Sequence, residues 1–234
     1  MVRCNELPPG EAIRILRSNR VFSVLDDQVL ARLCEVACRQ LFGRGERVVR
    51  QGDRCSELFI VEFGYLKAFS AREDGDDTIY SVMGPTEVFG ELAFFGEGTR
   101  SADVTTLAST GLVALSAAPL QRTLASSTAL MAQLAEVSVG RVRRLSQKHK
   151  DASRSVQQRL AACLLDFAGR FGSERSDGSV RIPFRLTQQE FGDYIGATRE
   201  FVNRHLRDWE REGLLRKHEG GLVISDPTAL EPIP

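Results

Sequence analysis

The pattern of hydrophobic and polar positions changes twice along the chain. Up to about residue 40, apolar residues recur at helical spacing, and Asp26 or Asp27 is placed to cap a helix that runs through Leu30, Leu33 and Ala37. Residues 41–116 instead contain short apolar runs separated by glycines, which is typical of a sandwich, barrel or roll. Helical spacing returns after Ser116. The pattern therefore predicts a β-rich domain flanked by helical segments.

A long helix is predicted to begin after Ser126 or Ser127, and it carries one apolar seam with a single polar member. The seam residues are spaced by three or four positions: Met131, Leu134, Ser138, Val142 and Leu145. Such a seam directly after a β-domain favours pairing with a second copy of the chain, while packing of the helix on its own domain is the alternative. The basic residues on the other faces are most simply a solvated surface.

The last 80 or so residues predict a helix-turn-helix followed by a hairpin. Thr187 and Glu190 have capping-box spacing, Gly196 permits a tight turn, and Thr198 is placed to cap the second helix. Residues 180–184 predict an edge strand, because Pro183 lacks an N–H donor. Residues 215–224 predict a glycine-tipped wing. The side chains predicted to contact DNA bases or phosphates are Thr187, Thr198, Arg199, Glu200, Asn203, Arg204, Arg207 and Lys217. An ordinary three-helix unit is the alternative.

Composition narrows the function classes. The chain has 234 residues with 31 Lys+Arg and 31 Asp+Glu, so contact with nucleic acid must come from a local cluster. No signal peptide or membrane-length apolar run is visible, which predicts a cytoplasmic protein without membrane contact. The five cysteines predict reduced thiols, with Cys34 and Cys38 sharing a helix face. The three histidines are scattered, so we expect no metal site, and no catalytic constellation indicates an enzyme.

One short stretch between the β-rich runs has the chemistry of an anion site. Arg100 can make a charge-assisted fork to phosphate oxygens, and the Ser101 hydroxyl can add a donor. The Glu91 carboxylate can accept from a ribose hydroxyl, and Gly90 lets the backbone approach the sugar. A cyclic phosphodiester with a ribose needs such a set. A surface ion pair between Glu91 and Arg100 is the alternative.

Taken over nearly its full length, the chain resembles the cAMP receptor protein (catabolite activator, CRP-FNR) superfamily of bacterial transcription regulators. Residues 45–53 match the family's Gly-Glu-x-Val-x-x-Gln-Gly-Asp pattern, and residues 198–204 resemble its recognition helix. The resemblance implies an α+β fold in three parts. Residues 1–125 would form N-terminal helices and a jelly-roll-like cyclic-nucleotide-binding β-roll, residues 126–150 a dimerisation helix, and residues 151–234 a winged helix-turn-helix domain, with a hinge at 150–154.

By the same resemblance, the chain is a cyclic-nucleotide-responsive homodimer that binds palindromic double-stranded DNA with TGTGA-like half-sites and contacts RNA polymerase. The implied ligand is cAMP or cGMP, and the implied ligand-binding residues are Gly90, Glu91, Leu92, Ala93, Arg100, Ser101, Ala102, Leu145 and Ser146. The family's cAMP activators carry Thr-Ser on the dimer helix, where this chain has Leu145-Ser146. The missing threonine hydroxyl leaves the choice between adenine and guanine open.

Other interpretations within and beyond the family remain. A family member that acts without a cyclic nucleotide, or with another effector, is one. A cyclic-nucleotide-binding module whose C-terminal domain contacts protein is another, although the outward Arg199, Glu200 and Arg204 argue against it. Iron–sulfur oxygen sensors have clustered N-terminal cysteines, and haem-binding carbon monoxide sensors have axial ligands in the roll. Here Cys4 stands alone near the N-terminus and no histidine precedes His149, so neither cofactor is expected.

Overall fold

The computed structural model describes residues 4–72, 75–96 and 98–230. The chain divides into two compact units. The first contains Met1–Ser70 and Val82–Arg144, and the second contains Ala71–Ser81 and Leu145–Pro234. No helix in the described parts is long and apolar enough to cross a membrane.

The first unit opens with a short strand, β1 (Cys4–Glu6), and two helices, α1 (Pro9–Ser18) and α2 (Asp27–Cys34). The Asp26 carboxylate accepts from the Val29 N–H and caps α2, as the sequence predicts. However, α2 ends at Cys34, earlier than predicted, because Ala37 already begins strand β2 (Ala37–Phe42) and pairs with Leu115. Cys34 and Cys38 therefore do not share a helix face.

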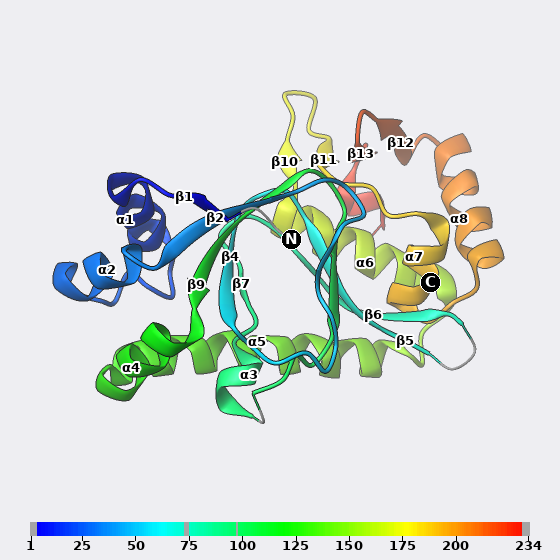
Figure 1. Ribbon diagram of the computed structural model, residues 1–234. Coiled ribbons are helices and arrows are strands. Elements are labelled where there is room, and N and C mark those ends of the chain that lie inside the picture. The colour runs from blue at the N-terminus through cyan, green and yellow to red at the C-terminus, as the bar shows by residue number, and fades with distance from the viewer. Residues whose placement is uncertain (1–3, 73–74, 97, 231–234) are drawn as a thin grey trace. The chain divides into compact units, whose positions relative to one another are not determined.

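Two sheets curl into the predicted β-roll (Figure 1). In the five-stranded sheet the order is β1-β2-β9-β4-β7, and in the four-stranded sheet it is β3-β8-β5-β6. The remaining strands are β3 (Arg47–Val49), β4 (Glu57–Phe63), β5 (Leu66–Ala71), β6 (Asp77–Met83), β7 (Val88–Phe89), β8 (Asp103–Thr106) and β9 (Thr110–Ser116). Phe59, Leu66, Met83 and Phe89 are buried among the apolar side chains inside the roll. A one-turn helix, α3 (Leu92–Phe95), follows β7.

Helix α4 (Ala117–Ser126) leads into the long helix α5 (Thr128–Asp151). The predicted seam of α5 divides between two roles. Leu134, like Leu130, is fully buried in the core that α1 and α2 share with the roll. In contrast, Met131, Val139, Val142 and Leu145 are 45, 49, 61 and 43% exposed. The alternative of packing on its own domain thus holds for Leu134, while an exposed apolar strip remains on the helix.

The second unit contains the predicted helix-turn-helix and wing. Helix α6 (Val156–Phe171) begins with the Ser155–Gln158 capping box, and α7 (Gln188–Ile195) begins with the Thr187–Glu190 capping box. Gly196 adopts a φ of 69° before α8 (Arg199–Arg211). The wing is formed by β12 (Leu215–His218) and β13 (Gly221–Ile224), and a 3-10 helix, η1 (Pro227–Leu230), follows.

One strand of this unit differs from its prediction. Strand β11 (Val180–Ile182) ends before Pro183 and lies between β10 (Ser173–Glu174) and β13 in a four-stranded sheet. It is therefore an interior strand and not an edge strand. Because the strand stops before Pro183, that residue takes no place in the hydrogen-bond ladder.

The cysteines also depart from expectation. Cys38 is disulfide-bonded, whereas Cys34, Cys55 and Cys163 are free thiols. Among the described residues no three His, Cys, Asp or Glu side chains are grouped so that they could hold a metal ion.

Candidate functional site

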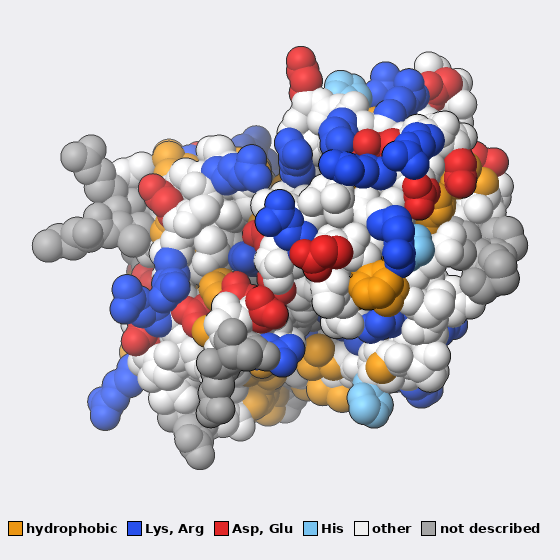
Figure 2. All heavy atoms as spheres, turned by 90° about the vertical axis from the view of Figure 1, so that its right-hand side faces the viewer, with side chains coloured by type: hydrophobic (Ala, Val, Ile, Leu, Met, Phe, Trp, Pro, Cys, Tyr) orange, Lys and Arg blue, Asp and Glu red, His pale blue; other side chains and the backbone are white. Residues whose placement is uncertain are grey.

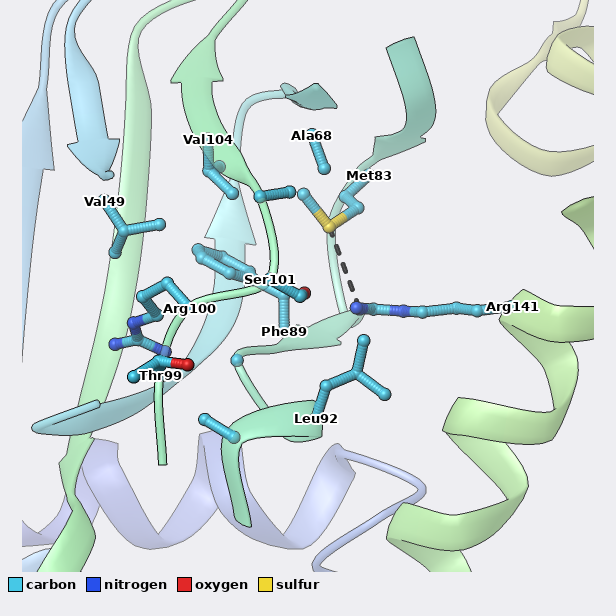
Figure 3. Close-up of a pocket in the computed structure, with 13 residues that line it drawn as sticks. Val49, Ala68, Met83, Phe89, Leu92, Thr99, Arg100, Ser101, Val104 and Arg141 are labelled. Carbon is cyan, nitrogen blue, oxygen red and sulfur yellow. Dashed lines mark hydrogen bonds between the residues drawn. The ribbon is translucent and has the colours of Figure 1, made fainter. Parts of the chain in front are cut away.

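A cavity in the roll brings together most of the residues that the sequence predicts for ligand binding (Figure 3). Arg100 and Arg141 enter it from opposite sides. Its volume is about 40 Å³, well below that of a pocket occupied by an organic ligand, so such a ligand requires side chains to move. The lining residues are Val49, Ala68, Met83, Phe89, Gly90, Leu92, Ala93, Thr99, Arg100, Ser101, Ala102, Val104 and Arg141.

Arg100 is the central cation of this cavity. Its side chain is held from several directions and is only 6% exposed. Nη2 donates to the Glu57 carbonyl at 2.8 Å, and the guanidinium carbon lies 5.3 Å from the centre of the Phe59 ring. Nη1 is buried and has no hydrogen-bond acceptor among the described residues. A buried cation with an unused donor is suited to an anionic ligand.

Gly90 makes room for this guanidinium. The residue has a φ of 89°, a conformation that favours glycine. A Cβ atom placed on Gly90 would lie 2.3 Å from Arg100 Nη1. The sequence predicts that Gly90 lets the backbone approach a sugar, and the structure adds that a side chain here would displace Arg100.

Glu91 forms a buried ion pair with a partner that the sequence did not single out. Its side chain is fully buried, and Oε1 lies 3.1 Å from Arg141 Nη1. Neither carboxylate oxygen accepts a hydrogen bond from the described residues. Burial raises the pKa of Glu91 against the opposing charges of Arg141, Arg144 and Arg100. The unsatisfied oxygens can accept from a ligand hydroxyl.

Arg141 is therefore a site residue and not part of a solvated basic face. It reaches from α5 into the cavity, where Nη2 donates to the Val88 carbonyl at 2.7 Å and contacts the Met83 sulfur at 3.8 Å (Figure 3). In the sequence nothing distinguishes it from the neighbouring Arg143. Only the position of α5 beside β7 selects one arginine of this basic run.

Leu145 and Ser146, the predicted contacts to the base, belong to the second unit, and both are exposed. Within that unit, Leu145 lines a separate cavity of about 900 Å³ together with Thr198, Arg199 and Glu200. The structure thus groups Leu145 with the predicted DNA-reading residues.

The predicted reading surface lies on α8. Arg199, Glu200, Arg204 and Arg207 are exposed, and Lys and Arg side chains gather on the face that carries α8, with acidic and hydrophobic side chains among them (Figure 2). The pKa of Glu200 is lowered by its own backbone N–H at the start of the helix and by the Thr198 hydroxyl. Glu200 is therefore an anionic acceptor at neutral pH.

Four other predicted DNA contacts have partners within the chain. Asn203 is half-buried and accepts from Gln188 Nε2 at 2.7 Å. The Thr187 hydroxyl accepts from the Glu190 N–H and caps α7. Thr198 makes no capping bond to the α8 backbone, and its hydroxyl instead hydrogen-bonds the Glu200 side chain. Lys217 forms an ion pair with Glu210 at 2.8 Å, which a DNA phosphate would have to replace.

Comparison with known proteins defines first the class and then the family. Residues 39–127 match the family model of the cyclic nucleotide-binding domain, and residues 158–233 match that of the Crp-like helix-turn-helix domain. A CRP-like cAMP-activated global transcriptional regulator of Mycobacterium tuberculosis is 31% identical over 217 residues, which cover 92% of this chain and 96% of that protein. The cAMP-activated regulator Vfr of Pseudomonas aeruginosa is 27% identical over 80% of this chain and 88% of its own.

Solved structures agree on the fold. FixK2 from Bradyrhizobium japonicum superposes with a TM-score of 0.72 at 19% identity, covering 83% of this chain and 96% of that one. The c-di-GMP responsive regulator CLP of Xanthomonas campestris gives a TM-score of 0.70 at 21% identity, covering 85% and 99%. The chain belongs to the CRP-FNR superfamily of transcription regulators. It combines a cyclic-nucleotide-binding domain with a DNA-binding helix-turn-helix, in a family of regulators and not of enzymes.

Proposed function

We propose that this chain acts as a homodimeric transcription regulator whose binding to palindromic DNA is controlled by cAMP or cGMP. The observation that carries the proposal is the pair of unsatisfied buried groups in the roll. Arg100 Nη1 can donate a hydrogen bond to an anion, and the Glu91 carboxylate can accept a hydrogen bond from a hydroxyl of the same ligand. The same chain exposes Arg199, Glu200 and Arg204 on α8.

The ligand's cyclic phosphate binds Arg100 Nη1 and the Ser101 hydroxyl, and its ribose hydroxyl donates to Glu91. Leu92, Ala93 and Ala102 supply the apolar wall. The cavity must widen on binding, and Arg141 links this change to helix α5. Because Arg141 pairs with Glu91 and belongs to α5, a sugar that engages Glu91 also changes the position of the long helix.

The base is selected outside the phosphate site, at Leu145 and Ser146. Ser146 supplies one hydroxyl, and Leu145 supplies none. The names of the similar regulators from Mycobacterium tuberculosis and Pseudomonas aeruginosa favour cAMP. A single hydroxyl distinguishes adenine from guanine weakly, so we expect both nucleotides to bind.

Dimerisation uses the exposed apolar strip of α5, within residues 126–150. Two copies then place two α8 helices in successive major grooves, about 34 Å apart. Ligand binding shifts the equilibrium toward this arrangement only if it binds the DNA-competent state more tightly.

On each half-site, Arg199 and Arg204 fork onto guanines, and Glu200 accepts from a cytosine amino group, as a TGTGA-like sequence allows. Thr187, Thr198, Arg207 and Lys217 contact phosphates, and Asn203 supports the reading face. We further propose RNA polymerase as a partner and the cytoplasm as the location, both by analogy with the family.

A second candidate is a family member that works without a cyclic nucleotide. The observation that favours it is the small volume of the cavity, about 40 Å³, together with the ion pair that its lining residue Arg141 already forms with Glu91.

Calorimetry with cAMP and cGMP side by side tests the ligand. We expect Arg100→Ala to weaken binding by about 30-fold or more, equivalent to ~2 kcal/mol for a buried charge-assisted contact. Arg143→Ala, which removes an exposed arginine from α5, is the matched control. No heat with either nucleotide would favour the second candidate, and unchanged affinity in Arg100→Ala would place the ligand elsewhere.

A mobility shift on a TGTGA-type palindrome tests the DNA contact. We expect a shift that Arg204→Ala removes. The absence of a shift at every ligand concentration would contradict the regulator and support a domain that contacts protein.

A further inference from the structure

Phe201 is an exposed aromatic residue on the reading helix. It lies in the first turns of α8, between Glu200 and Arg204, and is 44% exposed. The inward face of α8 is formed by other residues, since Val202 and Trp209 are buried at 0% and 2%. Phe201 thus has no place in the core. An exposed aromatic residue is also a poorer helix former than alanine, so local stability does not explain it.

Phe201 also contacts Arg204, a predicted base-reading residue. The guanidinium carbon of Arg204 lies 4.6 Å from the centre of the Phe201 ring. Residues three apart are neighbours on a helix surface, so this contact needs no distortion of α8. The cation–π contact holds the flat guanidinium beside the ring. When Arg204 contacts a base edge, the Phe201 ring therefore lies next to that base.

The major groove contains one apolar group suited to such a ring. A guanidinium forks onto guanine O6 and N7, and the apolar feature of the base-pair edges is the C5-methyl group of thymine. A phenyl ring has no donor for a phosphate oxygen, which makes a backbone contact unsuited to it.

We propose that Phe201 is a specificity-determining residue that packs against the C5-methyl of a thymine next to the guanine bound by Arg204. This inference rests on the proposed DNA-binding function and deepens it. Phe201 adds a preference for thymine at one position of the half-site, and Arg204 provides the neighbouring guanine contact.

The test uses a duplex selected by the protein from a random pool, in the presence of cyclic nucleotide. Each thymine of the half-site is replaced in turn by deoxyuridine, which removes only the methyl group. Affinities are measured by fluorescence anisotropy for the wild-type protein and for Phe201→Thr. We expect the wild type to lose about fourfold in affinity at one thymine, as for one buried methyl-sized group. Phe201→Thr should show no difference between thymine and uracil there.

Two controls accompany the measurement. Leu41→Thr removes a side chain of β2 that is 51% exposed, and it should keep the full methyl preference. Circular dichroism melting confirms that Phe201→Thr is folded, which its exposure leads us to expect.

Three outcomes would contradict the inference or its basis. A wild type that binds its selected duplex without methyl dependence overturns the inference and leaves the proposed function standing. The inference also fails if Phe201→Thr retains the preference, as it does when thymine and uracil duplexes are weakened equally, because Phe201 would then only orient Arg204. Failure to select or bind any duplex overturns the proposed function together with the inference.

Discussion

The groups that matter most in the roll are two buried polar side chains, each of which has atoms without a hydrogen-bond partner among the described residues. Arg100 is fixed through Nη2 on Glu57 and by the ring of Phe59, which leaves Nη1 unused. Glu91 is fixed beside Arg141. An unsatisfied buried group costs about 1–3 kcal/mol, and a ligand that satisfies both groups recovers this energy.

Gly90→Ala should damage both stability and ligand binding. The added Cβ meets Arg100 Nη1 at 2.3 Å in a backbone with φ of 89°. We expect a loss of at least about 2 kcal/mol in the free energy of unfolding, measured by urea denaturation. Gly45→Ala is the matched control, since Gly45 has a φ of 79° but no atom of the described residues lies within 4 Å of an added Cβ. It should lose only about 1 kcal/mol and keep ligand affinity. Equal effects of both changes would show that the contact with Arg100 is irrelevant.

Lys148 should make the stability of the second unit depend on pH. Its ammonium donates to the carbonyls of Ile79 and Tyr80 and lies 3.1 Å from the centre of the Tyr194 ring. Burial lowers its pKa to about 8, against an ordinary value of 10.5, with Cys163, Asp166 and Arg170 as the nearby titratable groups. Between these values the unfolded chain binds a proton that the folded chain lacks, so stability from this residue rises with pH.

The measurement compares the wild type with Lys148→Met by denaturation at pH 7.5 to 10.5. The difference in the free energy of unfolding, wild type minus variant, should grow by up to about 1.4 kcal/mol per pH unit across this range. A difference that stays constant with pH would refute the lowered pKa.

At the scale of elements, the two helices of the helix-turn-helix begin differently. Helix α7 has a complete capping box, with the Thr187 N–H donating to Glu190 at 2.7 Å and the Glu190 N–H donating to Thr187 at 3.1 Å. At α8, Thr198 makes no capping bond to the backbone and instead hydrogen-bonds Glu200. Side-chain capping bonds thus stabilise the start of α7, whereas the start of α8 lacks such a bond.

Thr187→Ala should therefore cost about 1 kcal/mol in the free energy of unfolding, the usual value of an N-cap hydroxyl. Thr198→Ala is the natural comparison and should cost less than half of that. Chemical denaturation followed by circular dichroism measures both. A larger loss for Thr198→Ala would mean that its hydroxyl does cap α8.

At the scale of the whole molecule, helix α5 carries an exposed apolar strip. Val142 is 61% exposed, while Leu130 and Leu134 on the same helix are fully buried. Exposed apolar residues that line up along a helix mark an interaction site. The proposed homodimer covers this strip.

Val142→Glu should weaken dimerisation by at least about 100-fold, because a carboxylate would be buried in an apolar interface. Sedimentation velocity measures the shift to monomer, and binding to a palindrome should fall with it. Arg143→Glu introduces the same charge on the next, exposed position as a control and should remain dimeric. A dimeric Val142→Glu variant would place the interface on another surface.

The features that the sequence alone predicted correctly depend on interactions between residues that are close in the chain. The capping boxes at Ser155 and Thr187, the turn at Gly196 and the hairpin tipped by Gly220 each depend on residues a few positions apart, and all are present in the structure. The β-roll and the family were also correctly predicted, because the sequence alone contains short apolar runs separated by glycines and the two family motifs at residues 45–53 and 198–204.

Only the tertiary structure decided the rest. The pairing of Glu91 with Arg141, the burial of Leu134 and the interior place of β11 each join segments far apart in sequence. The roles of Leu145, Ser146 and the DNA-reading side chains remain predictions. A helical repeat of arginines or leucines looks the same whichever neighbour it meets, so periodicity predicts which face a residue occupies but not what that face contacts. Gly90, Arg100 and Ser101 are close in the sequence and line one cavity, whereas Arg141 was found only in the structure. The ligand-binding roles of these residues and of Glu91 remain predictions.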